Sequence, residues 1–333
     1  MFSALKKYCE NLGCTHYLIA QILKLIILYS VNSSFMNRRN FLQNSAFTFG
    51  ALTLTQQNIL SSFFQPTWKI TMLSKEVGIF TEKGGTIAFL LSKNGIVVVD
   101  SQFPEQSVHL IDEMKKRSEK PFKLLINTHH HGDHSSGNIS FKGIVEHVLA
   151  HANSLKNQKR VAETQKTEDK QLYPDQTFTD TWCQKFGKEK ICLSYHGAAH
   201  TDGDAIIHFE HANIAHMGDL VFNRRHPFVD RSAGANMKNW IEVLNKAVNK
   251  FDNNTVYVFG HAGTGFEVTG KADDLKKFGD YIGQILKFVE GEIKNGKTKD
   301  EVTKTTTLPF ETEWKGDGLN RPLQAAYEEL TAK

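Results

Sequence analysis

Apolar residues along the chain form two kinds of pattern, short continuous runs and longer segments with helical spacing. Short apolar or alternating runs predict strands at residues 77–80, 86–91, 96–100, 122–126, 181–186, 190–195, 205–209, 214–217 and 255–259. Helical spacing predicts helices at residues 105–117, 237–248, 275–293 and 322–330. Residues 152–172 are polar and charged without a clear strand, so we expect a helix or an excursion there.

The organisation that these patterns predict is a single domain. No internal repeat, proline-rich linker or low-complexity tract interrupts residues 63–333, which we therefore assign to one domain. A hairpin around Gly187 and Lys188 would place Cys183 and Cys192 opposite each other. Directly opposed residues have Cβ atoms roughly 4.5–5.5 Å apart, longer than a disulfide prefers, so the pairing stays open.

Residues 1–62 form a leader with a different composition. Arg38 and Arg39 precede Phe41 and Leu42, and no charged residue follows from Phe41 to Phe64. This resembles a twin-arginine export signal, which implies the export machinery as a partner and a periplasmic protein. We expect translation to start at Met36, so that residues 1–35 result from a start codon assigned too early. The alternative, a membrane anchor at residues 17–31, is short and contains Lys24, so we expect no stable anchor in the mature protein.

The formal charge of +4 lies entirely in this leader. Residues 1–62 hold five basic residues and one acid, which leaves 35 basic and 35 acidic residues in the remaining chain. A neutral mature chain removes the charge argument for a nucleic-acid partner, so we expect a small-molecule substrate instead.

Metal-binding side chains cluster after the strand expected at residues 122–126. In an extended segment His129 and His131 point to the same side, while His130 points away. Gly132 lets the chain turn, so that Asp133 and His134 can face the same cavity from the next helix. Imidazole nitrogens and carboxylate oxygens suit zinc in an open, catalytic site.

Three further candidate ligands follow at later turns beside glycine. They are His200 in Gly197-Ala198-Ala199-His200-Thr201-Asp202-Gly203, Asp219 in Gly218-Asp219, and His261 in Gly260-His261. Taken singly, each is more often an ordinary loop residue. Together with the first cluster they make seven candidate metal ligands, each close to the end of an expected strand.

The order His-x-His-x-Asp-His, His-Thr, Gly-Asp and Gly-His resembles the metallo-β-lactamase superfamily, over roughly residues 70–265. The resemblance implies an α/β fold, a four-layer αββα sandwich with two zinc ions at one edge. By position, His129, His131 and His200 would hold the first metal. Asp133, His134 and His261 would hold the second, and Asp219 would bridge both.

The function that this resemblance implies is an exported zinc-dependent hydrolase. It would use a metal-bound hydroxide, oriented by Asp133, to cleave an ester, lactone, thioester or amide, a β-lactam included. A bridging aspartate looks more like the broader hydrolase branches than like the true β-lactamases. The alternative is a sulfur dioxygenase with one iron on the same fold, which needs fewer ligands than the seven present.

For three further residues and one short segment, the sequence leaves two alternative roles open. Asp100 ends a buried run and either orients a ligand histidine or caps a turn. His151 either faces the site or lies on the surface. Residues 223–226 contact an anionic substrate or form a solvated turn, and Phe228 either walls a pocket or packs in the core.

Overall fold

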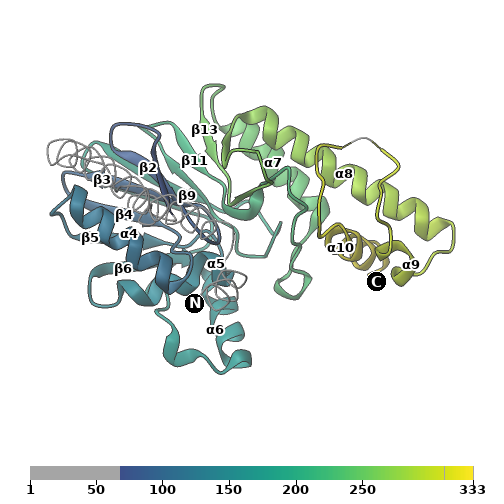
Figure 1. Ribbon diagram of the computed structural model, residues 1–333, viewed down its shortest axis with the longest axis horizontal. Helices are drawn as coiled ribbons and strands as arrows, with labels where there is room; N and C mark the ends of the chain where they lie inside the picture. The colour runs from purple at the N-terminus through teal and green to yellow at the C-terminus, as the bar shows by residue number, and fades with distance from the viewer. Residues whose placement is uncertain (1–67, 311, 333) are drawn as a thin grey trace, which may run out of the picture. The chain divides into compact units, whose positions relative to one another are not determined.

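Two β-sheets organise the part of the chain that the computed structural model describes, residues 68–310 and 312–332 (Figure 1). The chain divides into two units at Pro66, and the second unit runs from Thr67 to Lys333. The export signal and the alternative anchor lie in residues outside the described ones. Among the described helices, none has the length and apolar character needed to cross a membrane.

The first sheet has seven strands in sequence order. They are β1 (Lys69–Met72), β2 (Val77–Thr81), β3 (Ile87–Ser92), β4 (Gly95–Val99), β5 (Phe122–Ile126), β6 (Val145–His151) and β7 (Gln176–Phe178). The first four are antiparallel neighbours, whereas β4 to β7 pair in parallel. The carboxyl ends of β4 and β5 therefore lie at one edge of the sheet, and the histidine cluster follows β5 there.

The second sheet has the order β15-β13-β11-β10-β9-β8. Its strands are β8 (Thr181–Phe186), β9 (Glu189–Ser194), β10 (Ile206–Phe209), β11 (Ile214–His216), β13 (Val256–Val258) and β15 (Thr269–Gly270). Since β11 and β13 are parallel, their carboxyl ends share an edge. Two short strands, β12 (Phe222–Asn223) and β14 (His261–Ala262), pair beyond that edge.

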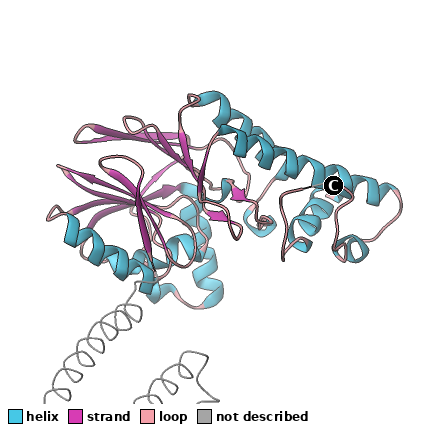
Figure 2. Ribbon diagram, turned by 45° about the horizontal axis from the view of Figure 1, so that its top comes forward, coloured by secondary structure: helices cyan, strands magenta, loops and turns pink. Residues whose placement is uncertain are grey.

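Helices cover the outer faces of both sheets (Figure 2). The α-helices are α4 (Pro104–Arg117), α5 (Gly132–Ser135), α6 (Ala152–Gln165), α7 (Met237–Lys250), α8 (Ala272–Lys294), α9 (Lys299–Thr303) and α10 (Asn320–Thr331). The 3-10 turns are η1 (Ser136–Phe141), η2 (Glu168–Lys170), η3 (Gly218–Leu220) and η4 (Arg231–Ala233).

Three apolar cores hold these layers together. One lies between the sheets, with Val97 from β4 and Ile207 from β10. A second joins the first sheet to α4 through Leu110 and Met114. A third joins the second sheet to α7, α8 and α10, with Trp240 fully buried in it. The expected four-layer αββα sandwich is thus confirmed, with burial of apolar side chains on both faces of each sheet as its driving force.

The elements that the apolar pattern predicted are present, with small shifts at their ends. For example, α8 begins at Ala272 rather than at residue 275, and α10 begins at Asn320 rather than at residue 322. The polar segment 152–172 forms α6 and η2, so the helical reading of it was right. The short strands β1, β7, β12, β14 and β15 were not predicted, because two to four residues carry too little periodicity. For β6, only the apolar run at residues 148–150 indicated a strand.

The hairpin of β8 and β9 pairs Cys183 with Cys192 in register. Their sulfur atoms are bonded, at 2.00 Å. Their Cα atoms lie 4.2 Å apart. The question that the sequence left open is answered in favour of a disulfide.

His151 is structural, and neither of its two expected roles was right. The side chain is buried, its Nδ1 accepts a hydrogen bond from the Asn153 amide at the start of α6, and its Nε2 donates to the Thr179 carbonyl. The ring also stacks on Tyr195 at 4.1 Å. Burial lowers the pKa of His151, and the bond from Asn153 requires an unprotonated Nδ1.

We expect this histidine to make the fold sensitive to acid. Below about pH 6.5 the unfolded chain protonates His151 while the folded chain does not, so the unfolded state gains protons and stability falls as the pH drops. In the variant His151→Asn, whose side chain still caps α6, the free energy of unfolding should fall less between pH 8 and pH 5.5 than in the parent. Urea denaturation at each pH measures this.

The matched control is His211→Asn, which replaces an exposed histidine. Its stability should follow the parent across the same pH range. An unchanged pH dependence in His151→Asn would contradict the assignment.

Candidate metal centre

The two sheets bring their ligand-bearing ends together at one edge. His129 and His131 follow β5, His200 lies before β10, and Asp219 lies in η3 directly after β11. His261 opens β14 after β13. All seven predicted residues are therefore placed at this edge, in two groups whose candidate ligand atoms lie within 4.8 Å of one another.

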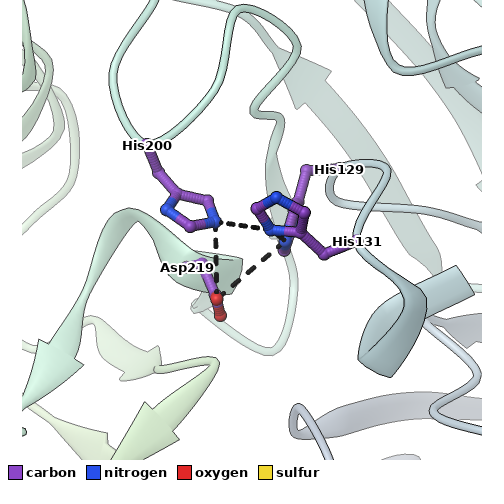
Figure 3. A group of neighbouring side chains, drawn as sticks. All are labelled: His129, His131, His200 and Asp219. Carbon is purple, nitrogen blue, oxygen red and sulfur yellow. Dashed lines mark hydrogen bonds and ion pairs between the residues drawn. The ribbon is translucent and has the colours of Figure 1, made fainter. Parts of the chain in front are cut away.

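The first group comprises His129, His131, His200 and Asp219 (Figure 3). His131 Nδ1 lies 3.0 Å from His129 Nε2 and 2.9 Å from His200 Nε2. Asp219 Oδ2 lies 3.5 Å from His200 Nε2 and 3.9 Å from His129 Nε2. Three ring nitrogens and one carboxylate oxygen thus converge on one point, as a tetrahedral metal site requires.

The second group comprises Asp133, His134 and His261. His261 Nε2 lies 3.1 Å from Asp133 Oδ2, and His134 Nε2 lies 4.0 Å from the same oxygen. Asp219 reaches this group too, with Oδ1 at 3.0 Å from His134 Nε2 and Oδ2 at 3.4 Å from His261 Nε2. Asp219 therefore lies between the groups, at the position expected of a bridging carboxylate.

Two buried atoms test whether these residues fit a metal. His134 Nε2 and Asp219 Oδ1 have no hydrogen-bond partner among the described residues, although they lie only 3.0 Å apart. Leaving such groups unpaired away from water is unfavourable. A cation between them would satisfy both, so the donor set fits a bound metal ion.

Electrostatics keep the first group ready to bind. Burial lowers the pKa of His200 to about 3, with His131 adding to the effect, and burial also holds the pKa of His129 well below its usual value. Both rings are therefore neutral near pH 7, which leaves a nitrogen lone pair available. Burial alone would raise the pKa of Asp219, but His261 and His134 hold it far below the ordinary range, so this carboxylate is ionised.

Asp100 orients both the cluster loop and a ligand histidine. Its carboxylate accepts hydrogen bonds from the Thr128 amide and hydroxyl and from His134 Nδ1, each at 2.7 Å. Asp100 is fully buried and adopts a left-handed backbone with φ of 65°. The orienting role was one of its two open readings, and it is confirmed. Fixing Nδ1 in this way turns His134 Nε2 toward the centre.

Two glycines allow this close packing. A Cβ atom on Gly85 would lie 2.1 Å from the His134 ring, and one on Gly260 would lie 2.0 Å from Asp219 Oδ1. The loop that holds Gly85 is tied down, because its amide donates to the Asp133 carbonyl and its carbonyl accepts from Gln102. Only glycine fits at either position.

The loop after Asp219 contributes residues that the sequence did not single out. Asp230 Oδ2 lies 2.9 Å from His131 Nε2 and orients that ring, and the Phe228 carbonyl accepts from His200 Nδ1. No local motif marks Asp230, which lies 99 residues from its partner. Phe228 is 41% exposed with its ring 5.3 Å from His131, so it walls the site and the core reading was wrong. His130 belongs to neither metal group but lies 3.5 Å from Asp230.

Comparisons with known proteins agree with this geometry. Residues 82–261 match the model of the metallo-beta-lactamase superfamily. A search of curated proteins found no significant match.

Solved structures with the same fold include two metallo-beta-lactamases and a sulfatase. A metallo-beta-lactamase from Pontibacter korlensis is 20% identical with a TM-score of 0.55, covering 65% of this chain and 99% of that one. Metallo-beta-lactamase IND-7 is 21% identical with a TM-score of 0.53, again covering 65% and 99%. A double variant of the sec-alkyl sulfatase PisA1 is 15% identical with a TM-score of 0.60, covering 76% of this chain and 49% of that one. At such identities the likeness concerns the fold alone.

Removal of the Asp100 carboxylate should destabilise the fold, because three buried donors would lose their hydrogen-bond acceptor. In Asp100→Ala the Thr128 amide, the Thr128 hydroxyl and His134 Nδ1 lose a buried acceptor, and we expect the free energy of unfolding to fall by about 3 kcal/mol or more. Urea denaturation of chelator-treated protein measures the loss. Asp100→Asn keeps an acceptor and tolerates the left-handed backbone, so it should lose less.

The control for this experiment is Asp112→Ala, which removes an exposed carboxylate from α4. It should change stability by less than about 0.5 kcal/mol. If Asp100→Ala were as stable as this control, the orienting role would be wrong.

Proposed function

The chain belongs to the metallo-beta-lactamase superfamily, and from this premise we propose that it is a hydrolase holding two zinc ions in the centre described above. Members of this superfamily are metal-dependent hydrolytic enzymes, and this chain is a metallo-hydrolase of that kind. The proposed substrates are an ester, lactone, thioester or amide, a β-lactam among them.

The position of Asp219 is the observation that supports two metal ions. Its two oxygens together reach both groups, because Oδ1 lies near His134 of the second group, while Oδ2 lies near His200 of the first group and His261 of the second. A carboxylate that served a single ion would not need ring nitrogens around both oxygens. Six other candidate ligands, three for each ion, complete the set. This favours the hydrolase over the alternative with one iron.

When bound, such metal ions lower the pKa of water and polarise the oxygen of the group to be cleaved. The protein's own contribution begins with Asp133. Its side chain is 31% exposed, whereas those of Asp219 and His134 are almost inaccessible. The pKa of Asp133, which burial would raise, is held below its ordinary value chiefly by the bond to His261, so the carboxylate is ionised. It can therefore orient an incoming water and accept its proton.

Neighbouring residues hold this arrangement rigid and partly dry. Asp100 and Asp230 fix the His134 and His131 rings, and the Phe228 carbonyl fixes His200. The exposed Phe228 ring gives one apolar wall at the entrance. The ligands are thus preorganised before any substrate enters, which keeps the cost of reorganisation small.

Metal analysis and hydrolysis of one sample test the proposal. Protein loaded with zinc should contain two zinc ions per chain by mass spectrometry and should cleave at least one member of a panel of esters, lactones, thioesters and β-lactams. Asp219→Ala should retain at most one ion and lose about 100-fold or more in kcat/KM, as expected when a group that positions the reacting atoms is removed.

Asp112→Ala, which changes an exposed carboxylate of α4 that is not among the candidate ligands, should keep both ions and full activity. Two zinc ions in Asp219→Ala would defeat the bridging assignment. One iron per chain together with oxygen uptake on a persulfide would overturn the hydrolase in favour of the dioxygenase.

We further propose that the protein is exported to the periplasm by the twin-arginine machinery. The support is the Arg38-Arg39 pair with its uncharged continuation, residues that lie outside the described part of the structure. The Cys183–Cys192 disulfide also supports export, because disulfides persist in oxidising compartments.

The arginine pair provides the test of export. Replacing Arg38 and Arg39 by lysine keeps the charge but removes the paired guanidinium groups, and the protein should then stay in the cytoplasm on fractionation of a bacterial host. The matched control exchanges the exposed Lys115 and Lys116 of α4 for arginine and should leave export unchanged. A periplasmic level equal to the parent in the Arg38/Arg39 variant would refute this route.

A further inference from the structure

A cavity of about 790 Å³ lies next to β14, the short strand that begins at the candidate ligand His261. Residues 224–226 after β12 form one wall, and residues 262–266 after His261 form the second. The segment before α10 and Arg321 within that helix form the third. Ala262 in the second wall directly follows the candidate ligand His261, and Arg225 in the first wall lies 3.3 Å from His261 Nδ1, so the cavity adjoins the second ligand group through these two residues.

The cavity has an excess of positive charge. The charged residues that line it are Arg224, Arg225, Lys315 and Arg321 against Glu313 and Asp317. Arg224 is buried and already neutralised, with Nη1 at 2.6 Å from Asp274 and Nη2 at 3.0 Å from Glu313. Because Glu313 already pairs with Arg224, its charge is not available to neutralise the other cations of the cavity.

The remaining cations of the cavity outnumber the carboxylates that could neutralise them. Within the described residues, the side chains of Lys315 and Arg321 make no hydrogen bond or ion pair, and Arg225 contacts only His261 Nδ1, at 3.3 Å. Three free cations therefore face one free carboxylate, Asp317. Phe266, 45% exposed, adds an apolar surface beside them.

We propose that this cavity binds an anionic group of the substrate, a carboxylate, sulfate or phosphate carried next to the bond that is cleaved. The inference rests on the proposed hydrolase function and names its substrate class. Guanidinium groups bind such oxyanions through paired hydrogen bonds, and the lysine adds a point charge. Lys315 and Arg321 lie outside residues 82–261, so this site belongs to the chain's own C-terminal segment.

This assignment also resolves the residues after Asp219. Residues 223–226 had two open readings, a contact with an anionic substrate or a solvated turn. Arg224 fits neither, because its guanidinium is an internal ion-pair partner. Arg225 is exposed and faces the cavity, which is where the anion would bind.

Two esters that differ in charge test the proposal on zinc-loaded protein. They are para-nitrophenyl butyrate, which is neutral, and the mono-para-nitrophenyl ester of glutaric acid, which carries a carboxylate. The double variant Lys315→Gln with Arg321→Gln should raise KM for the charged ester by about tenfold and leave the neutral ester within about twofold. Both side chains are exposed, so the fold should tolerate the change.

The matched control is Lys115→Gln with Arg117→Gln, which removes the same two charge types from exposed positions on α4. It should leave both esters unchanged, which excludes a general effect of net charge. An equal change for both esters, or none for the charged one, in the Lys315/Arg321 variant would overturn the proposal.

Calorimetric titration with glutarate separates this proposal from the hydrolase assignment. The parent should bind glutarate about tenfold more tightly than the Lys315/Arg321 variant does, whether or not it cleaves either ester. Weak hydrolysis with this difference in binding would count against the hydrolase alone. Hydrolysis with equal glutarate binding in both proteins would overturn the anion site alone.

Discussion

A buried carboxylate between imidazole rings is the constraint on which the rest of this structure depends. Asp219 is almost inaccessible to water and is ionised, and an isolated buried charge of this kind is strongly unfavourable. The chain meets this cost by bringing four histidines from both sheets against its two oxygens. Gly260 removes the side chain that would collide with it, and the parallel pair β11 and β13 delivers Asp219 and His261 to the same edge. The arrangement of the two sheets therefore also supplies the histidines that compensate the buried charge of Asp219.

The sequence predicted this centre well because its ligands sit in patterns that local physics produces. His129 and His131 share a side of an extended segment, and glycine lies directly before Asp219 and His261 and three residues from His200. The sandwich itself followed from resemblance, and the apolar runs placed the main strands of both sheets. The predicted branch within the superfamily stays a prediction, since substrate choice depends on loops rather than on ligands.

What the sequence did not reveal lies in contacts between distant segments. Asp230 orients His131 across 99 residues, and Arg224 is neutralised by Asp274 and Glu313. His151 was expected at the site or on the surface, yet it caps α6 from a buried position. In each case the side chain's role is set by a partner that no local pattern identifies. Edge strands of two to four residues escaped prediction for a related reason, because neighbouring strands rather than their own sequence define them.

The spread of the ligands along the chain has a consequence for folding. Candidate ligands run from His129 to His261, so an ion bound in the native state closes a loop across both sheets. Closing long loops restricts the unfolded chain most, and a ligand that binds only the folded state shifts the equilibrium toward it. Neither half of the chain holds a complete first group, since His200 comes from the second sheet and the paired histidines from the first. The ion would thus act as a reversible cross-link between the two sheets, in addition to the apolar core that already joins them.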